Sequence, residues 1–311
     1  MTNATAALRL EGLTHAFGPT EVLSDIHLTL RAGEAVALLG PSGGGKTTLL
    51  HLAAGLLTPQ QGRVQRGFTR CAVMFQQPRL LPWQRTLDNI ALGLRAAGHA
   101  RAQAREAAAQ MGRRVGLDEA ALQAWPHQLS GGMQSRAALA RALVLSPELL
   151  LMDEPFAALD IGLKAQLQQL LQAETARHGS ALLMITHDPA EALRLADRVL
   201  VLAGRPGRIV HEQRLSVAPA ARSAAQVLQL SAELLQVPAV RQAFELPDEP
   251  GAVGQPCPES PSPLVGEGLG RGPSRLGRGP ATAPALTPGP SPKVGEGSKT
   301  PKTLRCEGPT C

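Results

Sequence analysis

The 311-residue chain is short of aromatic residues: it has five Phe, two Trp and no Tyr. Because 43% of its residues are hydrophobic, the sequence predicts a sizeable core of aliphatic side chains. No apolar run approaches the roughly 18–20 residues that a membrane-spanning helix needs. The opening stretch, MTNATAALRL, lacks the basic-then-apolar layout of a secretory signal. We therefore expect a cytosolic chain whose membrane association would come through a partner.

Cysteine is also scarce, which excludes a disulfide framework. The four residues are Cys71, Cys257, Cys306 and Cys311, and none has the spacing of metal ligands. The net charge of +6 does not single out a basic domain. Residues 251–311 hold seven Lys or Arg against four Asp or Glu, so about half of the excess lies there. The remainder is ordinary and favours no nucleic-acid partner.

Five short apolar runs predict the main strands. Nearly continuous runs of this kind are typical of strands that are covered on both faces. Segments with helical patterning separate them, which predicts an α/β fold with a mostly parallel sheet. The runs are AVALLG (35–40), CAVMF (71–75), LLLMD (149–153), ALLMIT (181–186) and RVLVLA (198–203).

Two further segments predict helices, and the end of the chain has no helical or strand pattern. Between about 86 and 130 there is no strand signal, and an Ala-, Arg- and Gln-rich stretch predicts two or three inserted helices. A final helix is expected within 221–244. We divide the chain into a main domain (1–215), a helical extension (216–246) and a low-complexity tail (247–311).

The predicted tail is rich in glycine and proline, which make up 24 of residues 251–311. The octapeptide PSPLVGEG (261–268) returns as PSPKVGEG (290–297). Two copies are too few for a solenoid, and neither has an apolar face, so we expect disorder. The repeat resembles a translated repetitive intergenic element, which would make the tail an accidental extension. A regulatory tail or a partner-binding linker is the alternative.

The stretch GPSGGGKTT follows the first of these apolar runs and fits the pattern G-x4-G-K-[ST]. Glycines let the backbone wrap closely, so that successive amide groups face phosphate oxygens at a helix N-terminus. The lysine supplies a full charge, Thr47 offers a hydroxyl to Mg²⁺, and Thr48 reaches an inner phosphate. An ordinary glycine turn is the alternative. The predicted phosphate loop consists of Gly40, Pro41, Ser42, Gly43, Gly44, Gly45, Lys46, Thr47 and Thr48.

Asp153 and Glu154 end the run LLLMD and predict the second part of the site. Ligands of open α/β sheets bind at the carboxyl ends of the strands. There Asp153 would hold Mg²⁺ and Glu154 would polarise the attacking water. A solvated turn is the alternative for these two acids.

His187 and Gln76 each follow a predicted strand and are expected at the same edge of the sheet. His187 is a candidate for contact with the terminal phosphate or the water, although a lone histidine is more often structural. Gln76 is a candidate ligand of Mg²⁺ or of the water. Each signal would be weak if it stood alone.

A second predicted anion site sits before another helical run, in the stretch HQLSGGMQSRAALARAL. Since one nucleotide already has its phosphate loop, this second site needs a different explanation. The combination resembles the ATP-binding cassette (ABC) ATPases over about residues 6–215, with all motifs in the family's order. The signature residues that carry the match are Leu129, Ser130, Gly131, Gly132, Met133 and Gln134.

The resemblance implies a P-loop NTPase fold with an antiparallel β subdomain and a helical subdomain at about 77–138. It also implies ATP and Mg²⁺ as ligands and a head-to-tail homodimer, in which Ser130 and Gly132 contact the terminal phosphate bound by the other copy. Asp160 would then lie at the dimer seam, and Phe17 would stack on adenine where the family often has Tyr. Met133 stands where the family usually has Gln, a departure that we do not expect to impair activity.

A family member with no membrane span implies two separate permease subunits and, indirectly, a periplasmic binding protein. The chain would then act at the cytoplasmic face of the inner membrane. LLPW and RPGRI resemble the nitrate, sulfonate and taurine importers, and related importers of bicarbonate, cyanate or thiamine-precursor pyrimidines share these motifs. A family member acting on nucleic acid or ribosomes is the alternative of another class. The distance from Lys46 to Ser130 is too short for the coiled coil of the chromosome-acting kind, and a phosphate-loop kinase would not need LSGGM.

Overall fold

The computed structural model describes residues 6–247, so the predicted low-complexity tail lies almost wholly outside the described residues and its disorder stays a prediction. Within the described range, none of the helices is both long enough and apolar enough to cross a membrane. All five apolar runs of the sequence form strands there.

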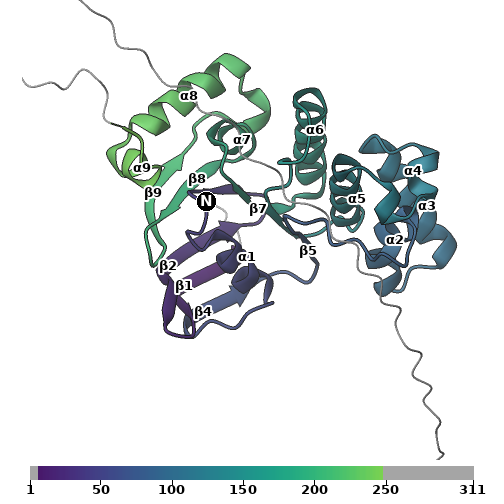
Figure 1. The fold of residues 1–311 in the computed structure, drawn as a ribbon, viewed down its shortest axis with the longest axis horizontal. Coiled ribbons are helices and arrows are strands. Elements are labelled where there is room, and N and C mark those ends of the chain that lie inside the picture. The colour runs from purple at the N-terminus through teal and green to yellow at the C-terminus, as the bar shows by residue number, and fades with distance from the viewer. Residues whose placement is uncertain (1–5, 248–311) are drawn as a thin grey trace, which may run out of the picture. The chain divides into compact units, whose positions relative to one another are not determined.

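These strands belong to one six-stranded sheet, which confirms the predicted parallel core (Figure 1). Its first five strands pair in parallel, and the last pairs antiparallel to its neighbour. This last strand has no apolar run in the sequence, because its side chains alternate between exposed and half-buried. The spatial order is β5 (Cys71–Met74), β6 (Leu149–Asp153), β7 (Ala181–Thr186), β3 (Ala35–Leu39), β8 (Arg198–Ala203) and β9 (Arg208–Arg214).

A second, antiparallel sheet is present, as the resemblance implied. It has the order β2 (Thr20–Arg31), β1 (Ala6–Phe17) and β4 (Gln61–Arg66). Along β1, Leu8 and Leu10 are buried whereas Arg9 between them is exposed, the period of two that a half-covered strand requires. The antiparallel sheet therefore turns one face to the core.

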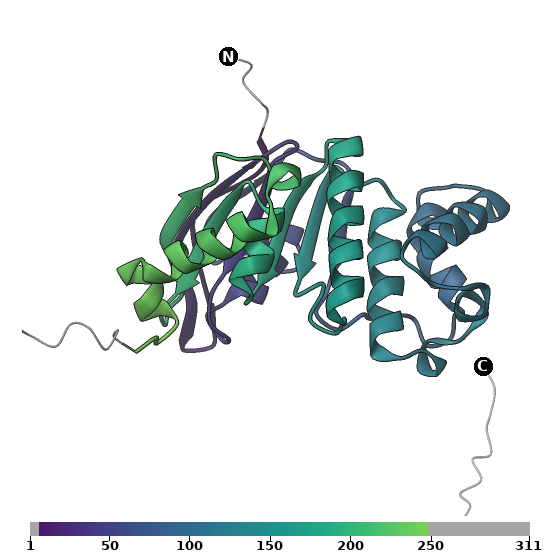
Figure 2. The same ribbon diagram turned by 90° about the horizontal axis from the view of Figure 1, so that it is seen from above.

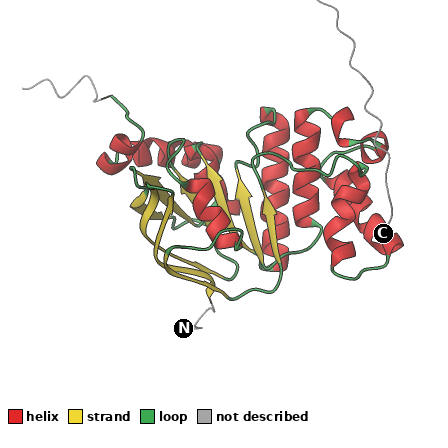
Figure 3. Cartoon of the chain, turned by 60° about the horizontal axis from the view of Figure 1, so that its bottom comes forward, coloured by secondary structure: helices red, strands yellow, loops and turns green. Residues whose placement is uncertain are grey.

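Nine α-helices complete the described part of the chain. Figures 1 and 3 show α2, α3 and α4 gathered at the end of the molecule away from the antiparallel sheet, with α5 between them and the strands. Figures 1 and 2 show α5 and α6 side by side. Helices are present where the sequence predicted them at 86–130 and 221–244, while the three domain boundaries stay predictions. The helices are α1 (Lys46–Ala54), α2 (Thr86–Ala96), α3 (Arg101–Arg114), α4 (Glu119–Gln123), α5 (Gly131–Leu143), α6 (Ile161–His178), α7 (Pro189–Leu195), α8 (Ala224–Gln236) and α9 (Pro238–Ala243).

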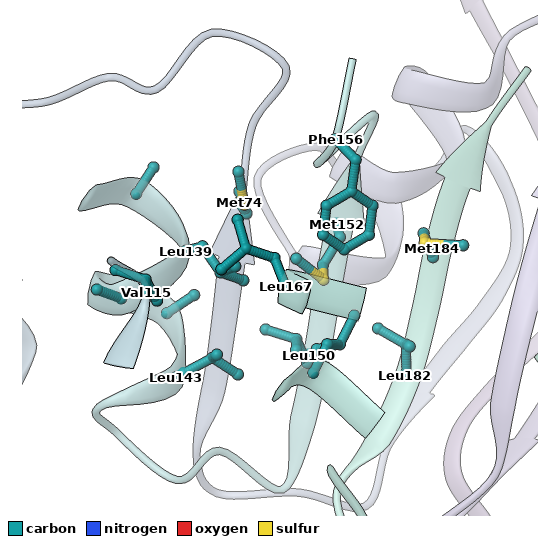
Figure 4. Close-up of a cluster of buried hydrophobic side chains, with 14 of the residues drawn as sticks. Met74, Val115, Leu139, Leu143, Leu150, Met152, Phe156, Leu167, Leu182 and Met184 are labelled. Carbon is teal, nitrogen blue, oxygen red and sulfur yellow. The ribbon is translucent and has the colours of Figure 1, made fainter. Parts of the chain in front are cut away.

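The core lies on both faces of the six-stranded sheet, because its strands alternate between two buried clusters. Leu151 and Leu183 face α1 and the antiparallel sheet. Leu150 and Met184 face the opposite way, toward α5, α6 and α7 (Figure 4). Phe156 is the largest fully buried side chain, and the others of that group are Leu or Ile, which confirms the predicted aliphatic core.

Polar N-cap residues fix where three helices near the site begin. The side chains of Ser130, Asp160 and Asp188 each accept a hydrogen bond from a backbone N–H in the first turn of α5, α6 and α7 respectively. Two of these caps were predicted as site residues from the sequence. The caps therefore place the turns from which the candidate site is built.

Candidate nucleotide-binding and hydrolysis site

The predicted phosphate loop joins β3 to α1, and its glycines are required by close backbone contacts. A Cβ atom on Gly40 would lie 2.1 Å from the carbonyl oxygen of Leu202 in β8. Gly45 has φ of +88°, and a Cβ atom there would lie 2.7 Å from Leu23 in β2. Only glycine tolerates both the approach and the left-handed conformation. The loop thus packs closely against both β8 and β2, which fixes its backbone conformation.

Lys46 opens α1, and its side chain folds back over the loop. Its Nζ donates to the carbonyl oxygens of Gly40 at 2.9 Å and Pro41 at 2.7 Å. Burial lowers the pKa of Lys46, while the nearby Glu154 and Asp153 carboxylates oppose that shift. The ammonium group and the free N–H groups of the first turn of α1 form a positive site that suits phosphate.

Thr47 and Asp153 lie together, as a shared metal site requires. Thr47 donates from Oγ1 to Asp153 Oδ2 at 2.7 Å, which joins α1 to the end of β6. Asp153 is only 2% exposed. Burial raises the pKa of its carboxyl, and the Thr47 hydroxyl partly offsets this. A hydroxyl and a carboxylate are the hard oxygen donors that Mg²⁺ takes when phosphates supply further ligands, so these residues fit that ion.

Glu154 and His187 meet at the same edge of the sheet. His187 Nδ1 lies 2.7 Å from Glu154 Oε2, and the Glu154 side chain is 15% exposed. Glu154 has φ of +48°, and its backbone N–H donates to Ile185 of β7 at 3.0 Å. A left-handed glutamate is strained, and such strain concentrates at functional positions. The arrangement sets a carboxylate and an imidazole in direct contact, at a position where either can also bind a water.

Gln76 is less closely placed than the sequence predicted. Strand β5 ends at Met74, so Gln76 lies in a bend two residues beyond the strand, with an exposed side chain. Among the described residues, no hydrogen bond joins Gln76 to Thr47, Asp153 or Glu154. Arg141 of α5 donates to the carbonyl oxygen of Pro78 at 2.7 Å and so anchors the loop that carries Gln76.

Ser130 is the N-cap of α5, the signature residues Gly131 to Gln134 form its first turn, and Leu129 lies just before it. Ser130 is exposed, and its Oγ accepts from Met133 N at 3.3 Å. Gln134 Nε2 donates to the carbonyl oxygen of Leu129 at 3.2 Å, which tightens the preceding turn. A Cβ atom on Gly132 would lie 3.4 Å from the carbonyl oxygen of Ala158, in the turn that leads to Asp160. The structure therefore brings the signature turn beside the Asp160 turn; Gly131, between Ser130 and Gly132, is exposed.

Phe17 ends β1 with 52% of its surface exposed, so its ring is free to stack on a base. Its edge meets the ring of His15 at a centroid distance of 4.9 Å. His15 is 6% exposed, and within residues 6–247 neither of its ring nitrogens has a hydrogen-bond partner. Nothing in the sequence distinguishes His15 as a site residue.

Comparisons with known proteins identify the family. The family described as ABC transporter matches residues 23–157. The chain is 44% identical over 254 residues to "Aliphatic sulfonates import ATP-binding protein SsuB 2" of Pseudomonas aeruginosa (strain UCBPP-PA14), covering 79% of this chain and 89% of that one. It is 47% identical to "Aliphatic sulfonates import ATP-binding protein SsuB" of Granulibacter bethesdensis, covering 77% and 98% respectively. The chain belongs to the ABC transporter ATP-binding family.

A solved structure supports the same conclusion for the fold. The dimeric post-hydrolysis state of the ATP-binding cassette MJ0796, bound to ADP and Pi, matches with a TM-score of 0.63 and 29% identity. The match covers 68% of this chain and all of the cassette. As a member of the ABC family, this chain binds ATP and is an ATP hydrolase coupled to transport.

Two supports of the ABC site were not predicted as site residues from the sequence. The first is the β8–β9 turn, where a Cβ atom on Gly207 would lie 2.3 Å from the carbonyl oxygen of Gly44. Gly207 N also donates to Val22 O at 2.8 Å, so the turn joins β2 to the phosphate loop. The second is a charged cluster around Lys164 of α6. The RPGRI stretch was a signal for the turn, but only as a mark of subfamily.

Proposed function

We propose that the chain is the ATP-hydrolysing subunit of an importer of aliphatic sulfonates. The observation that carries this proposal is the sequence identity of 44–47% to proteins named as aliphatic sulfonate import ATP-binding proteins, over nearly their whole length. Two membrane permease subunits would form the pathway, and a periplasmic binding protein would deliver the cargo. The chain would associate with the cytoplasmic face of the membrane through the permease.

Nucleotide binding would use the phosphate loop between β3 and α1. Backbone N–H groups of the loop and of the first turn of α1 would hold the phosphates, and Lys46 would leave its two carbonyl partners for the outer phosphates. Thr47 and Asp153 would hold Mg²⁺, which neutralises phosphate charge when bound. The exposed ring of Phe17 would stack on adenine.

Hydrolysis would depend on the Glu154 and His187 pair. Glu154 would accept a proton from the attacking water, and His187 would orient Glu154 or contact the terminal phosphate, as its 2.7 Å contact allows. Gln76 would join once its exposed loop approaches Asp153. Positioning and electrostatics account for most catalysis of phosphoryl transfer.

Dimerisation would complete each site. Ser130 and Gly132 stand at an exposed helix N-terminus, which suits a phosphate held by a second copy. Ser130 would exchange its bond to Met133 N for that phosphate. Asp160 would lie at the seam, and the matched MJ0796 cassette is itself dimeric. Loss of the bridging phosphate would then release the dimer.

The permease would dock on the helices inserted between β5 and β6. Trp83, in the loop before α2, is 70% exposed and is suited to such an interface. In the chain, the loop that carries Gln76 connects the nucleotide-binding part to the inserted helices. Docking would thereby be linked to hydrolysis.

Glu154→Gln tests the proposed chemistry. We expect it to preserve ATP binding, to trap a dimer and to lower turnover by orders of magnitude, because an amide cannot accept the proton. Glu11→Gln, an exposed carboxylate on β1, is the matched control and should hydrolyse ATP as the parent does. Parental turnover in Glu154→Gln would show that Glu154 is not the base.

Two further measurements complete the test. Lys46→Ala should lose most ATP affinity in a fluorescent-nucleotide titration. Deletion of the gene should abolish growth on aliphatic sulfonates as the sole sulfur source and leave growth on sulfate intact. Unchanged uptake of sulfonates, with loss of nitrate uptake instead, would contradict the cargo that we propose.

A further inference from the structure

A compact group of charged side chains lies against the turn that carries His187. Lys164, in the first turn of α6, places its Nζ 2.9 Å from Asp188 Oδ2 and 2.8 Å from Glu191 Oε1. The Glu191 side chain is only 4% exposed. A buried carboxylate is retained at such a site only when a cation and hydrogen bonds satisfy it. Lys164 therefore holds α6 to the start of α7.

The same group fixes both neighbours of His187. Thr186, which precedes it, donates from Oγ1 to Glu191 Oε2 at 2.5 Å. Asp188, which follows it, donates from its backbone N to Thr186 Oγ1 at 3.1 Å. With both flanking residues held, the imidazole is directed to Glu154. None of these contacts involves the phosphate loop.

Lys164 also connects this turn to the Asp160 turn. The backbone N of Lys164 donates to Asp160 O at 2.9 Å, and Asp160 caps α6 through Leu163 N. A cavity of about 200 Å³ separates the two turns, and Lys164, Glu154 and His187 are among the residues that line it. Lys164 therefore contacts both the Asp160 turn and the His187 turn.

We propose that Lys164 is a positioning residue, which holds His187 against Glu154 and ties this pair to the Asp160 turn. The proposal rests on the proposed function, in which Asp160 lies at the dimer seam and His187 serves hydrolysis. Lys164 contacts neither the phosphate loop nor Phe17. It therefore affects turnover through His187 and leaves nucleotide affinity unchanged.

The test measures Mg-dependent ATP hydrolysis and nucleotide affinity of the full chain. Lys164→Met should lower kcat by about 10- to 100-fold, the effect of misplacing a reacting group by about 1 Å. The Kd for a fluorescent ATP analogue should stay within about twofold of the parent. Lys164→Arg, which keeps the positive charge and offers N–H donors to both carboxylates, should restore most of kcat. If Lys164→Met melts below the assay temperature, Lys164→Gln is measured with the same expectation.

Arg114→Met is the matched control, because it breaks a similar ion pair near the far end of α6. Arg114 Nη2 lies 2.6 Å from Glu174 Oε1, and the Glu174 side chain is 5% exposed. This variant should lower the melting temperature yet leave the kcat of the folded protein unchanged. A purely structural role for Lys164 would make the two variants behave alike, and that result would overturn the proposal.

A double-mutant cycle gives a second readout. Because Lys164 acts through His187, Lys164→Met should add little to the loss of kcat in His187→Ala. Additive losses would contradict the proposal. The parent and Glu154→Gln test the proposed function separately. If the parent hydrolyses ATP and Glu154→Gln does not, while Lys164→Met keeps full kcat, then only the positioning role of Lys164 is wrong.

Discussion

Gly207, in the β8–β9 turn, packs against the backbone of the phosphate loop, and its replacement by alanine should weaken ATP binding. The added Cβ atom would lie 2.3 Å from the carbonyl oxygen of Gly44, whereas ordinary contacts begin near 3.4 Å. The obstructing atom belongs to the backbone and cannot rotate away. Gly207 has no positive φ, so alanine there brings a clash without conformational strain. The phosphate loop and the β8–β9 turn must then separate by about 1 Å, and we expect the loop to lose its phosphate-binding position.

The size of the effect follows from the bonds that such a movement breaks. A hydrogen bond from a backbone N–H to a charged group contributes about 1.5–3 kcal/mol. Loss of one such bond to a phosphate raises Kd by about 10- to 100-fold. We therefore expect Gly207→Ala to bind a fluorescent ATP analogue at least about tenfold more weakly than the parent.

Gly112→Ala is the control that separates a shift of the phosphate loop from the general effect of an added methyl group at a crowded glycine. Its Cβ atom would lie 2.5 Å from Leu122 Cδ2, the flexible end of a side chain in the helical segment. Leu122 can rotate, so this variant should keep the parental Kd. Melting curves without nucleotide establish that both variants are folded. A Kd for Gly207→Ala within twofold of the parent would refute the view that the β8–β9 turn positions the loop.

Three further predictions concern stability and reactivity. His15→Leu should raise the free energy of unfolding by about 1 kcal/mol in urea titrations, because it removes two buried nitrogens that lack partners; a loss of stability would contradict this. Burial raises the pKa of the Cys71 thiol to about 11, so alkylation of Cys71 at pH 8, followed by peptide mass spectrometry, should be at least about 100-fold slower than that of free cysteine. Burial alone would raise the pKa of Glu174, but the hydrogen bond and charge of Arg114, together with the nearby His178 and Arg177, outweigh burial and lower it. This stabilisation is complete above the ordinary carboxyl pKa of about 4.3 and lost as the pH falls through the lower folded value, so Glu174→Gln should flatten the acid limb of the stability curve.

The parts of the fold that could be predicted are those with a local cause. Each strand of the parallel core is a continuous apolar run, because both of its faces are covered. Strand β9 and the antiparallel sheet have one covered face, and their mixed patterns gave no comparable signal. The resemblance alone implied the antiparallel sheet, and nothing indicated β9.

The same division applies to the site. Gly40, Lys46 and Asp153 could be recognised because ligand chemistry dictates which residue types stand next to one another in the chain. The left-handed backbone of Glu154 could not, since it depends on the hydrogen bond to Ile185 in another strand. Lys164 is 24 residues from Asp188 in the sequence and has no neighbour that marks it.

Residues that hold a motif in place therefore follow different rules from the motif itself. A phosphate or a metal ion accepts few donor types, so the residues that bind it are constrained wherever the site is built. A support needs only to fill space or to pair a charge across a particular interface, as Gly207 and Lys164 do. Their effects on function should accordingly appear as changes in position, namely a weaker Kd for the loop and a lower kcat for the His187 turn, rather than as loss of a chemical group. Measuring both quantities in both variants distinguishes these two supports from each other.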